Sequence, residues 1–171
     1  MCLMSIVSTI ETIGDVSGIT KGGANREATD DEIHESIVLL KNLGAQFALL
    51  HCNATYPAPF KDINIKYMER LREQANCPVG YSSHERGINV VLASIGMGAN
   101  IIEKHFTVDR NMEGNDHRIS VIPKVFKEMV EGAKQVEMAI GNGGKRELGQ
   151  GELMNREILA KSLCMNVALA S

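Results

Sequence analysis

The sequence predicts an α/β fold in which a parallel sheet is covered by helices. Short apolar segments of strand-like composition alternate along the chain with amphipathic segments of helical period. Glycine and proline residues separate these segments, as is typical of the boundaries between strands and helices. The four expected strands are residues 16–20, 47–52, 77–82 and 100–106.

Helix signals lie between and after these strands. Thr29 and Glu32 form a capping box, in which each side chain reaches a free backbone N–H, and Gly44 ends the helix that this box begins. Two further helices are expected around residues 65–71 and 88–95. Residues 3–13 carry a weak, mixed pattern that favours part of a helix, and residues 47–52 are apolar enough for a strand buried on both faces.

A long helix is expected to begin at Pro123 and to end at Gly141. Its inner face is expected to comprise Phe126, Met129, Val130, Ala133, Val136 and Ile140. A last helical stretch covers residues 152–163.

Four strand–helix units in a row are half of a (β/α)₈ TIM barrel, which takes about 250 residues when complete. We therefore expect residues 1–145 to form a half barrel of four parallel strands, and residues 146–171 to form a helical tail. A half barrel leaves two strand edges without a partner, which favours pairing with a second copy into a homo-oligomer such as a dimer.

Composition limits the classes of partner. The net charge of −3, the scattered Lys and Arg residues and the aromatic content of 4% do not indicate nucleic acid binding. No apolar stretch reaches the length that spans a membrane, and no signal peptide precedes the first helix, so we expect a cytoplasmic protein. The four cysteines lack CxxC spacing and are interpreted as reduced thiols.

Two histidines stand at the ends of consecutive expected strands. His84 follows residues 77–82, and His105 lies in residues 100–106. Parallel strands bring both imidazoles to the carboxyl edge of the sheet, where ligands and metals gather in α/β folds. Glu103, two residues before His105, is expected on the same side of its strand and could orient a metal-bound water.

Four motifs occur in order along the chain, and together they resemble the sialic acid synthase family, including the related spore coat polysaccharide synthases. They are LHCNATYPAP at 50–59, GYSSH at 80–84, IEKHFT at 102–107 and MEGNDH at 112–117. The resemblance implies a (β/α)₈ barrel followed by a small antifreeze-like domain, with this chain corresponding to the last four barrel strands. It also implies condensation of phosphoenolpyruvate with an N-acetylated hexosamine, such as N-acetylmannosamine, to give a nine-carbon sialic acid and phosphate.

The resemblance implies a role for individual residues. His84 and His105 match the histidines that hold a divalent metal, usually manganese, with magnesium as the alternative. The expected catalytic residues are Asp116, from the resemblance, and Glu103, from its position two residues before His105. The residues expected to bind substrate are Thr20 and Ser82 on the phosphate side, and Tyr56 and Asp116 on the sugar side.

The sequence also departs from the family pattern. The family's first four strands and its antifreeze-like domain have no counterpart, and with them a lysine, a serine and a glutamate of the phosphate side are missing. Ser83 replaces the usual Asp of the Ser-Asp-His motif, which is expected to remove a carboxylate near His84. Asn115 replaces a proline, and Lys21 interrupts a turn that usually reads Ser-Thr-Gly.

Structural roles compete with these assignments. His51 in its apolar strand favours a hydrogen-bonded core group over a ligand. Ser82 could hydrogen-bond a backbone group at the end of its strand, and Asp116 could be a turn residue that stabilises the Gly-Asn-Asp turn. As alternatives to the synthase activity, the chain could be a non-catalytic, self-associating fragment, or an enzyme that makes seven- or eight-carbon sugar acids. The Tyr-Pro-x-Pro loop and the Gly-Asn-Asp turn argue against the last of these.

Overall fold

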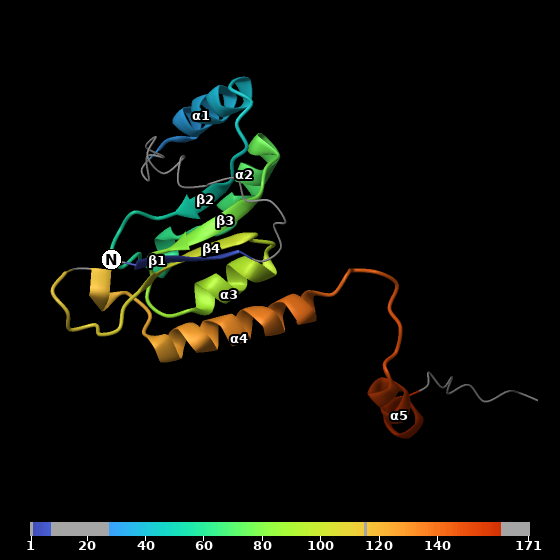
Figure 1. The fold of residues 1–171 in the computed structure, drawn as a ribbon. Coiled ribbons are helices and arrows are strands. Elements are labelled where there is room, and N and C mark those ends of the chain that lie inside the picture. Colours follow the sequence, from blue (N-terminus) through green and yellow to red (C-terminus); the bar gives the residue numbers. More distant parts are fainter. Residues whose placement is uncertain (1, 8–27, 115, 162–171) are drawn as a thin grey trace, which may run out of the picture. The chain divides into compact units, whose positions relative to one another are not determined.

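The computed structural model describes residues 2–7, 28–114 and 116–161. The described chain is an α/β structure with two compact units, Met1–Ile140 and Gly141–Ser171. Figure 1 shows the elements in chain order. The expected strand at residues 16–20, with Thr20, falls outside the described residues, as does Asn115.

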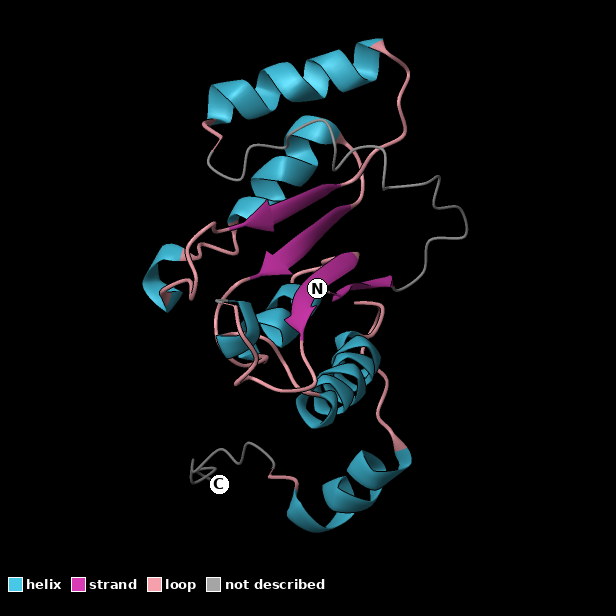
Figure 2. Ribbon diagram, turned by 60° about the vertical axis from the view of Figure 1, so that its left-hand side comes forward, coloured by secondary structure: helices cyan, strands magenta, loops and turns pink. Residues whose placement is uncertain are grey.

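The sheet contains four strands in the order β1-β4-β3-β2. They are β1 (Cys2–Val7), β2 (Leu49–Cys52), β3 (Val79–Ser83) and β4 (Ile101–Phe106). Strands β2, β3 and β4 are parallel, and Figure 2 shows their arrowheads at the same end of the sheet. Three of the four expected parallel strands are therefore confirmed.

Strand β1 corrects the expectation of a partial helix at the start of the chain. It runs antiparallel to β4, with Cys2 opposite Phe106 and Val7 opposite Ile101. An unpaired β4 would present a row of backbone N–H and C=O groups, and pairing with β1 satisfies this row. The pattern of residues 2–7 alone did not predict this outcome, because the partner strand lies far away in the sequence. One of the two edges that we expected to be free is thus covered.

Five α-helices occur in the described residues. They are α1 (Asp30–Asn42), α2 (Tyr67–Ala75), α3 (Asn89–Gly96), α4 (Pro123–Ile140) and α5 (Gln150–Leu159). The capping box of α1 is confirmed, because the Glu32 carboxylate accepts from the Thr29 backbone N–H at 2.7 Å and Thr29 Oγ1 accepts from the Glu32 N–H at 3.4 Å. This hydrogen bonding lowers the pKa of Glu32. Two short 3₁₀ helices, η3 (Phe60–Asp62) and η4 (Asp116–Arg118), lie in the loops.

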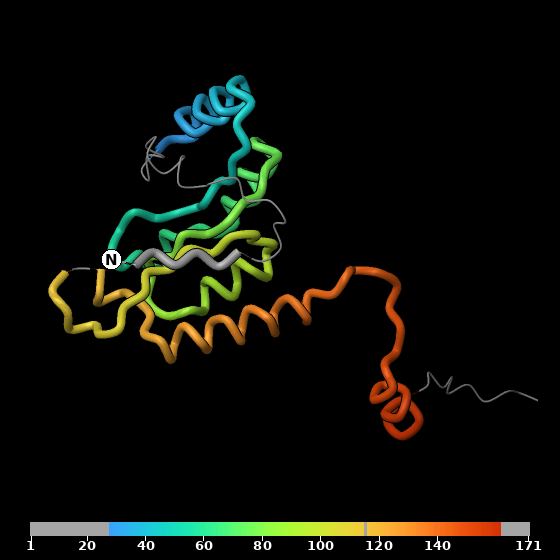
Figure 3. Tube along the Cα trace, viewed as in Figure 1, coloured from blue at the N-terminus to red at the C-terminus, as the bar shows by residue number. Residues whose placement is uncertain are grey.

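One hydrophobic core joins α2, α3 and α4 to the sheet. Its buried members include Met68 and Leu71 of α2, Val91 and Ile95 of α3, and Met129 of α4, together with Val79, Tyr81 and Ile102 of the strands. The trace in Figure 3 runs from β3 through α3 into β4, which is the expected strand–helix–strand unit. None of the described helices combines the length and the apolar character needed to cross a bilayer.

Two expectations about burial were wrong. Ile140, expected on the inner face of α4, is 52% exposed because it is the last residue of that helix. Strand β2, expected to be buried on both faces, is only half-buried along its length. It is the edge strand of the described sheet, so only β3 lies beside it.

Gly80 allows β3 and β4 to approach closely. A Cβ atom at this position would lie 2.7 Å from the Cβ of Ile101 and closer still to the Ile101 carbonyl oxygen. The neighbouring backbone belongs to the sheet ladder and cannot move aside without loss of strand pairing. Residue 80 must therefore be glycine for the two strands to keep this spacing.

We predict that Gly80→Ala lowers the free energy of unfolding by about 3 kcal/mol, because the added methyl group overpacks a rigid backbone contact. Gly96→Ala is the matched control, since a Cβ there meets only Val136 Cγ1 at 3.8 Å, an ordinary contact. Urea unfolding of the three proteins measures the difference. Equal stabilities would contradict the close approach of β3 and β4.

Candidate functional site

Two buried histidines meet at the carboxyl end of the parallel strands. His84 follows the last residue of β3, and His105 is the fifth residue of β4. Their ring centroids lie 5.3 Å apart with the ring planes at 64°, and both side chains are almost completely buried. The expected convergence of the two imidazoles is therefore seen, and their role as metal ligands stays a prediction.

The hydrogen bonds of His84 indicate which ring nitrogen carries the proton. Nδ1 lies 2.8 Å from the backbone carbonyl oxygen of Asn53, which can only accept, so Nδ1–H donates. Nε2 then has the lone pair, and the Tyr56 hydroxyl donates to it at 3.1 Å. The Tyr56 ring stacks on His84 at a centroid distance of 4.2 Å and meets the edge of His105 at 5.6 Å.

A thiol also lies against the His84 ring. Cys52 Sγ, at the end of β2, is 3.5 Å from Nδ1 and 3.7 Å from Nε2. The carboxyl ends of the three parallel strands thus each bring a side chain to this cluster, from β2, from the residue after β3 and from β4. The sequence had indicated only a reduced thiol at Cys52.

Ser82 and Glu103 face each other across β3 and β4. They are Cα partners in the parallel register, and Ser82 Oγ donates to Glu103 Oε1 at 2.9 Å. Strand alternation places Glu103 on the same face as His105. The hydroxyl of Ser82, expected to bind phosphate, orients the carboxylate of Glu103 in this structure, and the roles of both residues stay predictions.

One hydrogen bond of His84 is of the kind that accompanies metal binding, while the Tyr56 hydroxyl occupies the other ring nitrogen in this structure. A histidine that binds a metal through one nitrogen usually donates the other ring N–H to a carbonyl or carboxylate, which is what His84 does with Asn53. Within residues 2–7, 28–114 and 116–161, no group of three or more His, Cys, Asp or Glu side chains is placed to hold one ion. Two imidazole nitrogens would therefore leave the remaining positions to water or substrate, as in catalytic sites.

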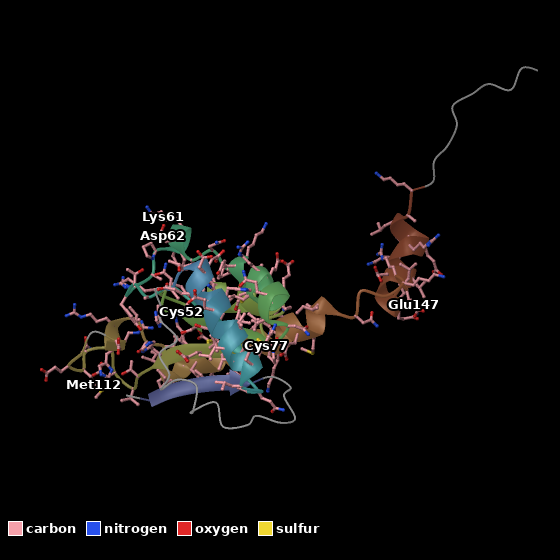
Figure 4. All side chains as sticks on the ribbon, turned by 90° about the horizontal axis from the view of Figure 1, so that it is seen from above. Cys52, Lys61, Asp62, Cys77, Met112 and Glu147 are labelled. Carbon is pink, nitrogen blue, oxygen red and sulfur yellow. The ribbon has the colours of Figure 1, made fainter. Side chains whose placement is uncertain are left out.

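A pocket of about 480 Å³ lies at the carboxyl end of β2, and neither His84 nor His105 is among its lining residues. Cys52 and Asn53, which contact His84, line this pocket together with His51, Ala54, Thr55, Asp62, Ile63, Asn64 and Tyr67. Figure 4 labels Cys52 and Asp62, two of the lining residues. A volume of this size accommodates a small polar substrate.

His51 has a structural contact within this pocket. Its Nε2 lies 2.6 Å from the Ile63 carbonyl oxygen, so Nε2–H donates to a backbone acceptor. Burial lowers the pKa of His51 below its ordinary value of 6.5, although the hydrogen bond to Ile63 opposes this effect. The geometry agrees with the interpretation of His51 as a hydrogen-bonded group.

Asp116 stands apart from this cluster in the described contacts. It begins η4, where its backbone carbonyl accepts from Ser120 Oγ at 2.7 Å. The neighbouring His117 bonds Thr107 through Nδ1 at 2.7 Å, just after the end of β4. Asp116 therefore lies in the loop that follows β4, and its expected role in catalysis or sugar binding stays a prediction.

Sequence reasoning missed a buried polar network on the opposite face of the strands. It comprises Tyr81, Ser83, Glu85 and Lys104, each only 1% exposed. Glu85 Oε2 accepts from the Tyr81 hydroxyl and Oε1 from Ser83 Oγ, both at 2.7 Å. Burial lowers the pKa of Lys104, which the nearby Glu85 charge opposes, and burial with the same carboxylate raises the pKa of Tyr81. The position of Lys104 could have revealed this network from the sequence. Glu103 and His105 face the site, so Lys104 between them must face the helix-covered core, and a buried lysine needs a charged or hydrogen-bonding partner.

The network corrects the expectation for Ser83. A carboxylate at position 83 was expected to act near the His84 ring, but the Ser83 side chain points to the helix-covered face. There its Oγ accepts from Lys104 Nζ at 2.7 Å. Alternation along β3 explains the difference, since Ser82 and Ser83 must face opposite sides of the sheet.

Comparisons with known proteins identify the family to which this sequence is similar. The sequence model of the NeuB family matches residues 23–145. The N,N'-diacetyllegionaminic acid synthase of Campylobacter jejuni is 42% identical over 135 residues, which are 77% of this chain and 40% of that protein. The resemblance to sialic acid synthases noted in the motifs is confirmed.

Solved structures give similar matches. The N-acetylneuraminic acid synthetase of Leptospira borgpetersenii has a TM-score of 0.69 at 31% identity and covers 86% of this chain and 56% of its own. The spore coat polysaccharide biosynthesis protein spsE of Bacillus subtilis has a TM-score of 0.64 at 31% identity, with 74% and 36% covered. The chain thus spans only part of each of these proteins.

The lowered pKa of His51 gives a prediction for stability against pH. The unfolded chain binds a proton at this residue more readily than the folded chain, so the free energy of unfolding falls as the pH drops through 6.5 towards the lower pKa of the folded state. We expect His51→Gln to make the fall between about pH 8 and about pH 5.5 smaller, as measured by urea unfolding at each pH. The exposed His34 of α1 provides the control His34→Gln, and an identical slope in all three proteins would contradict the prediction.

Proposed function

This chain belongs to the NeuB family, and from that membership we propose that it carries the metal-binding side of a sialic-acid-type synthase site. The proposed reaction condenses phosphoenolpyruvate with an N-acetylated amino sugar of the N-acetylmannosamine type. The observation that carries this proposal is the buried pair of His84 and His105, which has Tyr56 stacked against it. In this proposal β2, β3 and β4 are strands of the C-terminal half of a (β/α)₈ barrel.

The proposed chemistry rests on a divalent cation, manganese or magnesium, at the two imidazoles. Such a cation would supply a Lewis acid for the carbonyl oxygen of the open-chain sugar. The Asn53 carbonyl keeps the proton of His84 on Nδ1, so Nε2 carries the lone pair. The Tyr56 hydroxyl donates to this lone pair here, and a cation bound at Nε2 would replace that hydrogen bond. Tyr56 covers both rings, 4.2 Å from His84 and 5.6 Å from His105 between ring centroids, and limits the access of water to them.

Glu103 is the residue that we propose to act as a base or to hold the attacking water. Its Oε1 is oriented by Ser82, and its other oxygen is then available for a water or a substrate hydroxyl. The pocket at the end of β2 has a volume that suits a small sugar, and its lining residues Cys52 and Asn53 contact His84. Thr20 and Ser82 for the phosphate, and Tyr56 and Asp116 for the sugar, are proposed from the family resemblance.

The relatives are longer than this chain, so the activity of a whole synthase is itself a proposal here. The chain spans 40% of the legionaminic acid synthase that it matches. We propose that a further polypeptide segment supplies the lysine, serine and glutamate of the phosphate side.

We predict that the chain binds Mn²⁺ and that His84→Ala and His105→Ala each weaken this binding at least about a hundredfold, which exceeds the usual cost of losing an outer-shell partner. Isothermal titration calorimetry measures the dissociation constants. His34→Ala is the control, because His34 is an exposed imidazole on α1. Binding that survives both substitutions would refute the assignment of the ligands.

We predict that the chain releases phosphate from phosphoenolpyruvate and N-acetylmannosamine when it is combined with the N-terminal segment of a relative. Glu103→Gln should lower that rate by about 10²- to 10⁴-fold, the usual contribution of a general base. The exposed Glu113 gives the matched control Glu113→Gln. A colorimetric phosphate assay provides the readout.

A non-catalytic, self-associating fragment is the second candidate, and one observation favours it. Strand β2 is the edge of the described sheet, and only β3 pairs with it there. A fragment of this kind would release no phosphate with or without the added segment. It would elute in gel filtration at an apparent mass of at least two chains. A chain that elutes as a monomer and releases phosphate would rule out this second candidate.

A further inference from the structure

We infer that Glu85 and Lys104 are positioning residues that set the spacing between His84 and His105. The consequence for catalysis rests on the proposed function, whereas the positioning of the two imidazoles does not depend on that function. Glu85 directly follows His84 in the sequence, and Lys104 directly precedes His105. The two charged side chains therefore join the two segments that carry the imidazoles.

Backbone pairing between β3 and β4 does not extend to His84 and therefore cannot fix its position relative to His105. The last Cα pair between β3 and β4 is Ser83 with Lys104, so His84 and Glu85 lie beyond the end of the ladder. Lys104 Nζ continues the connection, because it donates to the Glu85 backbone carbonyl at 2.5 Å and to Ser83 Oγ at 2.7 Å. The ammonium group thus holds the residue on each side of His84.

The Glu85 carboxylate completes this arrangement. Its Oε1 lies 3.9 Å from Lys104 Nζ, and its two oxygens accept from Ser83 Oγ and from the Tyr81 hydroxyl. A charge that is 1% exposed is costly unless it is paired and hydrogen-bonded, and here both charges are. Loss of either charge leaves the other buried without compensation, so the segment would have to move to admit water.

Strand geometry transmits such a movement to the site. Lys104 faces the helix-covered side of β4, and its neighbours Glu103 and His105 face the other side. Asn53 and Ala58 also hold His84, the former at Nδ1 and the latter by donating its backbone N–H to the His84 carbonyl, but both belong to the loop after β2. They fix His84 relative to that loop, whereas Lys104 and Glu85 fix it relative to β4 and hence to His105.

The test compares the full chain with Glu85→Gln and with the double variant Glu85→Leu/Lys104→Met. The double variant replaces both charges by apolar groups of similar volume, which buried ion pairs commonly tolerate without loss of stability. It nevertheless lacks the bonds from Nζ to Ser83 and to the Glu85 carbonyl. Tyr81→Phe removes only one hydrogen bond to the Glu85 carboxylate. It is the milder variant to be tested if the double variant does not fold.

Two measurements are made on each folded variant. Imidazole ¹H–¹⁵N spectra without metal report the ring environments of His84 and His105 and the contact between the rings. Titration with Mn²⁺ reports the affinity, which we expect to fall by about ten- to a hundredfold, as for other partners that orient a ligand. We also expect the ring contact to weaken and the His84 signals to shift. Ser83→Asp in the Glu85→Gln background should restore both, because Oγ of residue 83 is already 2.7 Å from Lys104 Nζ.

Glu131→Gln is the matched control, because the Lys127–Glu131 pair of α4 joins the same residue types at 3.7 Å on the exposed surface. Unchanged ring signals in the folded variants would overturn the positioning role, whatever the wild-type chain binds. If the ring signals change but the wild-type chain binds no Mn²⁺, the positioning role stands and the proposed cation site is wrong. The two proposals therefore fail separately.

Discussion

Parallel pairing of β3 with β4 is the constraint on which the described site depends. The register places Ser82 opposite Glu103 and Ser83 opposite Lys104. Because side chains alternate between the faces of a sheet, the first pair faces the histidines and the second faces the helices. One register thus builds two polar layers, and a slip by one residue would exchange them and bury Glu103 in the helix core.

The character of the helix-covered face changes along the strands. At the start of β3 and β4 it is apolar, with Val79 and Ile102 in the core shared with α2, α3 and α4. Towards the carboxyl end it becomes polar, and Tyr81 marks the boundary, since its ring is in the core and its hydroxyl bonds Glu85. Polar side chains therefore gather on both faces at the end of the sheet where α/β folds bind ligands.

The sheet also shows how a chain that matches only part of its relatives arranges its strand edges. Strand β1 pairs with β4 in the antiparallel direction, and β2 remains at the other edge of the described sheet. The half-burial of β2, which supplies Cys52 to the cluster, follows from this edge position.

The sequence by itself predicted the main helices and the three parallel strands in their order. The capping box at Thr29, the apolar runs before His84 and His105, and Pro123 at the start of the long helix predicted local structure, because these signals act through neighbours in the chain. The meeting of His84 with His105 was also predictable, since parallel strands end at the same edge. Only the tertiary structure decided that residues 2–7 form a strand, that β2 lies at an edge, and that Lys104 finds Glu85. Each of these depends on a partner distant in the sequence, and the hydrogen bond or ion pair exists only once packing has brought the two together.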